Sequence, residues 1–164
     1  RVRSSAASDV YKRQVLVSGA SADIDGYGSE LERTMIVGEP TPQQRRAFDA
    51  MLALQARAIE VMAPGVPAGE VELATVRLAE ELGVADNLRH HVGHSIGLEG
   101  HEAPFLDRGD EAVLEAGMVF TVEPGVYVKE LGGFRHSDTV VITDDGCRVM
   151  TDYPRELKDL TVSS

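Results

Sequence analysis

Residues 90–105, HHVGHSIGLEGHEAPF, constrain this chain more than any other segment, because they hold four of its five histidines. Imidazole is the commonest metal ligand and a frequent general acid–base group, and glycine lets a ligand approach the backbone closely. Histidines packed among glycines at this density are not explained by core packing, and the segment is too irregular for a long helix. It therefore predicts a functional site rather than a surface patch of histidines.

Two later segments place charged residues beside predicted strands. Residues 117–127, GMVFTVEPGVY, put Glu123 at the end of an apolar strand, where a carboxylate costs desolvation energy unless a partner compensates it. Residues 132–143, GGFRHSDTVVIT, put Arg135 and His136 at the start of another apolar strand. Taken alone, the Glu123 segment is explained equally well by a site and by a solvent-facing strand end, and the Arg135 segment could be a salt-bridged sheet edge. We therefore interpret both together with the histidines.

A strand pair is predicted before them. Strands at 15–20 and 33–37 flank the turn-forming residues 25–28, Asp-Gly-Tyr-Gly, which suits a hairpin. If the second strand begins earlier, Glu30 and Glu32 share one of its faces, because side chains alternate along a strand. Such a pair is usually a solvated charged edge.

Two helices and several strands complete the predicted order. Thr41, Pro42 and Gln44 form a capping-box pattern that predicts a helix start, and Gly83 closes a second helix at 68–82. Further strands are predicted at 119–122, 125–128, 139–143 and 148–151. This order suits an α+β domain with helices on one face of a mainly antiparallel sheet.

The amino-acid composition limits the expected binding partners and the expected cellular compartment. The net charge of −11 makes nucleic-acid binding unlikely, because an acidic surface repels phosphate backbones. No apolar run approaches the roughly 20 residues that a membrane span needs, so we expect no membrane partner. The single cysteine, Cys147, cannot form an internal disulfide, and we expect a reducing, cytoplasmic location. Residues 1–14 are polar and basic, and we assign them no role in the fold.

Together these segments resemble the pita-bread family, which includes methionine aminopeptidase, aminopeptidase P, prolidase and creatinase. The resemblance rests on the GH-x-IGLE-x-HE-x-P and GMVFTVEPG-x-Y patterns and is nearest to the prolidase, aminopeptidase P and creatinase branch. It implies a pita-bread fold for residues 15–164, truncated at the N-terminus, with residues 1–14 outside the domain. It also implies a homodimer in the full-length parent protein.

The family's peptidases hold two divalent metals with two aspartates, one histidine and two glutamates. The resemblance places His94 at the histidine, Glu123 at one glutamate and Glu30 at one aspartate. Gly19 and Ser137 fall on the other two positions, so both have lost their carboxylate. We therefore expect one divalent ion, such as manganese, zinc or cobalt, or none, but not two.

The resemblance also implies catalytic roles. His90 and His101 would contact the scissile carbonyl and stabilise the developing oxyanion, and Glu123 would act as both ligand and general base. The leading hypothesis is accordingly a hydrolase similar to Xaa-Pro aminopeptidase or prolidase, acting on a short peptide.

Two alternatives stay open from the sequence. In a metal-free, creatinase-like C–N hydrolase or lyase, a histidine would move the proton, and Glu32, Arg135 and His136 would bind a small molecule. A glutamate at position 32 favours this alternative, because the family's peptidases usually carry a small polar residue there. The second alternative is a non-catalytic binding module with a degenerate site.

Overall fold

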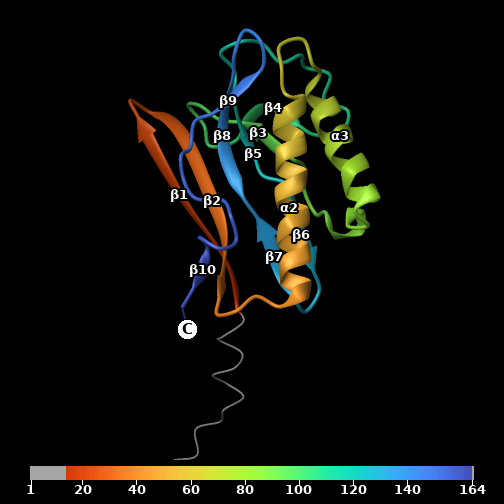
Figure 1. The fold of residues 1–164 in the computed structure, drawn as a ribbon. Helices are drawn as coiled ribbons and strands as arrows, with labels where there is room; N and C mark the ends of the chain where they lie inside the picture. Colours follow the sequence, from red (N-terminus) through yellow and green to blue (C-terminus); the bar gives the residue numbers. More distant parts are fainter. Residues whose placement is uncertain (1–13, 164) are drawn as a thin grey trace, which may run out of the picture.

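A computed structural model describes residues 14–163 of the chain (Figure 1). The expectation that residues 1–14 lie outside the domain therefore concerns residues outside the described range, apart from Gln14. The elements, in chain order, are β1 (Val15–Ile24), β2 (Tyr27–Val37), α2 (Pro42–Val61), α3 (Ala68–Glu81), the short 3-10 helix η1 (Ala85–Asn87), β3 (Gly93–Ser95), β4 (Glu102–Leu106), β5 (Val119–Val122), β6 (Gly125–Val128), β7 (Gly132–Arg135), β8 (Ser137–Ile142), β9 (Cys147–Val149) and β10 (Thr161–Val162).

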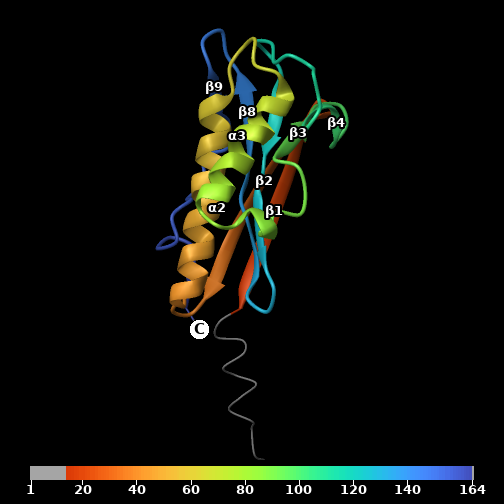
Figure 2. The same ribbon diagram turned by 90° about the vertical axis from the view of Figure 1, so that its right-hand side faces the viewer.

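One curved sheet organises the described part of the chain. Its strands lie in the order β1-β2-β8-β5-β3-β4, with β9 beside β8 and β10 beside β2, and every pairing except β10 with β2 is antiparallel. A separate two-stranded ribbon is formed by β6 and β7. Both long helices lie on the same side of the sheet (Figures 1 and 2). The predicted α+β architecture is confirmed.

Helix α2 begins where the capping box predicts. The Thr41 hydroxyl accepts a hydrogen bond from the Gln44 amide at 3.2 Å, and the Gln44 side chain accepts one from the Thr41 amide at 2.8 Å. Two apolar clusters then join the helices to the strands, because each helix buries one stripe of side chains. The first cluster packs the end of α2 and the start of α3 on β5 and β8; it includes Ala58, Met62, Val71, Phe120, Val122, Val140 and Ile142. The second packs the start of α2 on β2 and the β6–β7 ribbon; it includes Ile36, Phe48, Met51, Leu54, Val126 and Phe134.

The hairpin is longer than the sequence indicated. Strand β1 continues to Ile24 and β2 begins at Tyr27, so only Asp25 and Gly26 remain in the loop. Both loop residues have positive φ, 54° and 82°, which gives a two-residue turn of the kind whose twist matches the flanking strands. Strands β7 and β10 were not predicted as strands, and the histidine segment that holds β3 and β4 was predicted as either a loop or a strand; all four strands are short.

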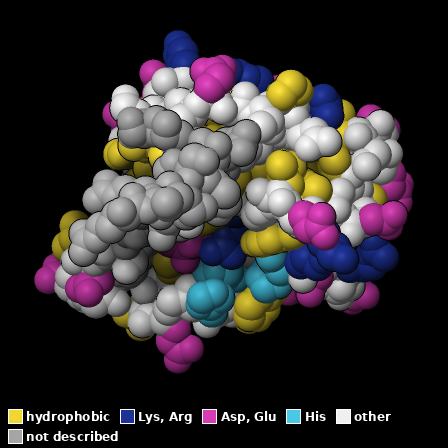
Figure 3. Space-filling model, turned by 90° about the horizontal axis from the view of Figure 1, so that it is seen from below, with side chains coloured by type: hydrophobic (Ala, Val, Ile, Leu, Met, Phe, Trp, Pro, Cys, Tyr) yellow, Lys and Arg dark blue, Asp and Glu magenta, His cyan; other side chains and the backbone are white. Residues whose placement is uncertain are grey.

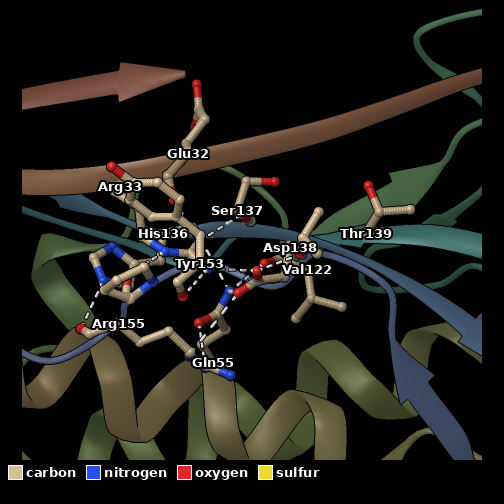
Figure 4. Close-up of polar contacts among 12 residues, drawn as sticks. Glu32, Arg33, Gln55, Val122, His136, Ser137, Asp138, Thr139, Tyr153 and Arg155 are labelled. Atoms are coloured by element: carbon tan, nitrogen blue, oxygen red, sulfur yellow. Dashed lines mark hydrogen bonds and ion pairs between the residues drawn. The ribbon is translucent and has the colours of Figure 1, made fainter. Parts of the chain in front are cut away.

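A buried ion pair fixes β2 against β8 and against helix α2. Arg33 donates to Asp138 at 2.7 Å, and Gln55 of α2 donates to the other Asp138 carboxylate oxygen at 3.0 Å. Neither charged side chain is more than 2% exposed. Figure 4 shows the neighbouring side chains Glu32 and Ser137 directed away from the helix, as strand alternation requires. The ion pair and the charged residues beside it therefore lie on opposite faces of the sheet.

Helix α3 is connected to the histidine segment through a buried carboxyl. Glu72 accepts a hydrogen bond from the Val92 amide at 2.9 Å, and the Val92 carbonyl accepts one from the Glu123 amide at 2.6 Å. Burial raises the pKa of Glu72 to about 7, and the Val92 hydrogen bond opposes this only in part.

Among the described residues, no helix combines the length and apolar character that a membrane crossing needs.

We predict that Gly93→Ala strongly destabilises the protein. A β-carbon at this position would lie 2.0 Å from the Thr121 carbonyl oxygen, which is backbone and cannot rotate away. The free energy of unfolding should fall by at least about 3 kcal/mol, as for severe overpacking. Gly100→Ala is the matched control, because a β-carbon there meets nothing within 4 Å. Urea denaturation measures both variants, and equal stability of the two would contradict the prediction.

We predict a pH-dependent effect for Glu72→Gln. The pKa of this carboxyl is about 7 when folded against 4.5 ordinarily, so the folded state holds the proton more tightly. Wild-type stability, relative to the glutamine variant, should therefore fall as the pH rises, by about 2 to 3 kcal/mol between about pH 5 and about pH 8. Denaturation of both proteins at the two pH values measures this difference. A difference that stays constant with pH for Glu72→Gln would refute the assignment.

Candidate functional site

Three acidic side chains meet on the face of the sheet opposite the helices. Glu30 and Glu32 extend from β2, and Glu123 follows directly after β5. One carboxylate oxygen from each lies within 4.8 Å of the others. Viewed from below, acidic, basic and histidine side chains gather on one part of the surface (Figure 3). The structure thus brings together carboxylates that are about 90 residues apart in the sequence.

His94 of β3 lies against one member of this group, Glu123. Its side chain is fully buried, its Nδ1 lies 2.9 Å from the Ser95 carbonyl oxygen, and its Nε2 lies 3.4 Å from Glu123 Oε1. An Nδ1–H that donates to the carbonyl leaves the Nε2 lone pair facing a carboxylate, and Nε2 has no hydrogen-bond partner among the described residues. Two acceptors placed in this way repel unless a proton or a metal cation lies between them.

The electrostatics of the pair agree with this geometry. Burial alone would lower the pKa of His94, but the adjacent Glu123 carboxylate and the Ser95 carbonyl outweigh it and raise the pKa. Burial alone would raise the pKa of Glu123, but His94 and the Arg135 guanidinium outweigh it and lower the pKa. The site therefore attracts positive charge to the space between the imidazole and the carboxylate.

Arg135 lies on the other side of Glu123, at the end of β7. Its Nη2 donates to Glu32 Oε1 at 2.7 Å, and its Nε forms an ion-pair contact with Glu32 Oε2 at 2.5 Å. Its Nη1 lies 3.7 Å from Glu123 Oε2. Burial would lower the pKa of Arg135, but Glu32 and then Glu123 outweigh it and raise the pKa, so the guanidinium stays charged.

The two positions without a carboxylate flank Glu32. Gly19 is its partner on β1, and Ser137 is its partner on β8. The Ser137 hydroxyl is buried without a hydrogen-bond partner among the described residues. Neither position supplies a charged metal ligand.

The other two predicted histidines differ in their surroundings. His101 is exposed, and its ring stacks on the His94 ring with centroids 3.9 Å apart. His90 has both ring nitrogens engaged, one 2.8 Å from the His91 carbonyl oxygen and the other 2.8 Å from the Tyr127 hydroxyl. A neutral His90 that donates to the carbonyl must accept from the tyrosine, so it has no N–H left for a substrate.

The structure does not bring His136 to this group. Its ring accepts from the Thr34 amide at 3.2 Å, lies 3.1 Å from the Arg155 carbonyl oxygen and packs edge-on against Phe48 of α2. The side chain is fully buried on the helix side of the sheet. Strand alternation explains this, because Arg135 faces the site and the next residue must face away. Its predicted contact with a substrate therefore has no support in its position.

Two aromatic neighbours of the site were not assigned from the sequence. His91 lies between His94 and Phe105, with ring centroids 6.1 and 5.6 Å away, and burial lowers its pKa. Tyr127 reaches His90 because Gly125 leaves room; a β-carbon there would lie 2.8 Å from both the hydroxyl and the imidazole. The Gly-x-Tyr spacing after Glu123 is the one signal that could have identified this tyrosine.

Comparisons with known proteins identify the family and the fold. The model of metallopeptidase family M24 matches residues 3–144. The Xaa-Pro dipeptidase of Pyrococcus furiosus is 40% identical over 148 residues, which cover 90% of this chain and 42% of that protein. The crystal structure of the prolidase from Pyrococcus horikoshii OT3 superposes with a TM-score of 0.84 at 37% identity, over 87% of this chain and 41% of the other. That of dipeptidase PepE from Mycobacterium ulcerans does so with a TM-score of 0.86 at 34% identity, over 92% and 40%.

This chain spans about two fifths of the length of the curated relatives it matches. The structural likeness covers 87% and 92% of this chain in the two crystal structures, and it confirms the pita-bread fold. On the matched family model and the shared identity, the chain belongs to metallopeptidase family M24.

Proposed function

We propose that the protein containing this chain is a metal-assisted dipeptidase that cleaves short peptides before proline. The observation that carries the proposal is the buried His94 Nε2, which has no hydrogen-bond partner among the described residues and faces Glu123 at 3.4 Å. Such an arrangement is suited to a cation. The names of the relatives, Xaa-Pro dipeptidase and prolidase, supply the substrate class.

Glu30, His94 and Glu123 are the residues that would hold a divalent ion. Two carboxylates and one imidazole are a suitable donor set for a single catalytic ion with open positions for water and substrate. When bound, such an ion lowers the pKa of water and polarises a carbonyl. Manganese, zinc and cobalt all accept these donors.

We assign the proton transfer and the stabilisation of the oxyanion to side chains of the protein. The lowered pKa of Glu123 keeps this carboxylate ionised at neutral pH, so it can accept a proton from the attacking water. His101, exposed and stacked on His94, is the imidazole that can donate to the developing oxyanion. His90 could do so only by giving up its bond with Tyr127, so we assign it first to holding that hydroxyl in place.

The metal-free, creatinase-like alternative loses one of its supports. It requires Glu32 to be available for a substrate cation, but Arg135 already occupies both of its carboxylate oxygens. The cytoplasmic location, the homodimer and the absence of nucleic-acid or membrane partners stay predictions from the sequence.

We predict that hydrolysis of an Xaa-Pro dipeptide by the intact protein is lost on chelation and restored by Mn²⁺, Co²⁺ or Zn²⁺. Glu123→Gln should lower kcat by about 10²–10⁴-fold, because it removes a base that acts in the transition state. Glu115→Gln, an exposed acid outside the site, should leave kcat unchanged. Dipeptide hydrolysis followed by amine release measures all three proteins.

Chelator-resistant cleavage of a small guanidino compound, with no dipeptide cleavage, would favour the creatinase-like alternative. No turnover of either substrate class and no metal uptake would favour a binding module.

A further inference from the structure

We propose that the guanidinium of Arg135 is a built-in cation that takes the place of a second metal ion. It is held by Glu32, whose side chain occupies the space that Gly19 leaves open. The inference rests on the proposed function, because it concerns the same cation site and sets how many ions that site accepts.

The first support is the order of residues across three neighbouring strands. Gly19 of β1 pairs with Glu32 of β2, and Glu32 pairs with Ser137 of β8. Gly19 and Ser137 are the positions where the family resemblance leads us to expect a carboxylate and the sequence has none. Glu32 therefore stands between both missing ligands, on the same face of the sheet.

The second support is space. A β-carbon on Gly19 would lie 2.9 Å from Glu32 Cγ and 3.2 Å from Glu32 Oε1. The φ of Gly19 is not in the left-handed region, so its backbone does not require glycine. A ligand side chain at position 19 and the observed conformation of Glu32 thus exclude one another. The observed conformation of Glu32 therefore depends on the glycine at position 19.

The third support is the contact of Arg135 with the cluster. The guanidinium binds Glu32 through two nitrogens and reaches Glu123 with a third, at 3.7 Å. A planar guanidinium suits such paired contacts better than a point charge does. The Ser137 hydroxyl is neutral, so nothing at that position competes for the guanidinium.

The charges of the cluster decide the expected number of ions. Glu30, Glu32 and Glu123 supply three negative charges, and Arg135 neutralises one of them. The two that remain match a single divalent cation beside His94. A second divalent ion would lack both ligands at positions 19 and 137 and would leave the site with excess positive charge next to Arg135.

Mn²⁺ binding to the intact protein tests the inference. Equilibrium dialysis followed by metal analysis should give one ion per wild-type chain. Arg135→Gln should tighten Mn²⁺ binding by about tenfold or more, because it removes a positive charge beside the ion. If Arg135 served merely to orient Glu123, its removal would instead weaken Mn²⁺ binding. Arg148→Gln, an exposed arginine of β9, is the control and should change nothing.

Two further variants keep the test decisive if Arg135→Gln does not fold. Arg135→Lys keeps the charge and should keep one ion per chain at close to wild-type affinity. The triple variant Gly19→Asp, Glu32→Thr, Ser137→Glu restores both ligands and removes the grip on Arg135, and it should take up two ions.

The outcomes separate the two claims. Two tightly held ions in the wild type, or weaker binding by Arg135→Gln, overturn the inference and leave the proposed function standing. No uptake by the wild type overturns the proposed function. If the wild type takes up no Mn²⁺ but Arg135→Gln does, the result still supports the built-in cation. If neither protein takes up Mn²⁺, the inference is overturned as well.

Discussion

The buried ion pair between Arg33 and Asp138 sets the register on which the rest of the structure depends. It joins β2 to β8 beneath helix α2 and is almost completely excluded from solvent. Because side chains alternate along a strand, an inward-facing Arg33 and Asp138 require an outward-facing Glu32 and Ser137 (Figure 4). A slip of one residue would bury Glu32 against the helices and leave Arg33 unpaired, which is costly for a buried charge.

On the outward face, the arrangement of charged side chains determines where negative charge is concentrated. Three carboxylates lie close together, and Arg135 engages one of them, so the remaining negative charge is concentrated near His94. The helix layer contributes at a distance, because Glu72 holds the Val92 amide while the Val92 carbonyl holds the amide of Glu123. The position of Glu123 is thus supported by backbone hydrogen bonds that no pattern of side chains would indicate.

The sequence predicted the regular elements well where local chemistry is strong. The capping box at Thr41, the second helix and the strand before Glu123 agree with the structure. It left the segment that holds β3 and β4 open between a loop and a strand, because the pairing of these short strands depends on partners elsewhere in the fold. It also grouped His136 with the site, although a regular strand faces that side chain toward α2.

The sequence by itself determined the family, the order of the elements and the residue types available to the site, because motifs and hydrophobic patterns are local. It also showed that positions 19 and 137 lack a carboxylate. Only the tertiary structure decided that both positions flank Glu32 and that Arg135 pairs with this glutamate. Strand register and side-chain contacts between residues 100 apart are set by packing of the whole sheet, and no local pattern encodes them.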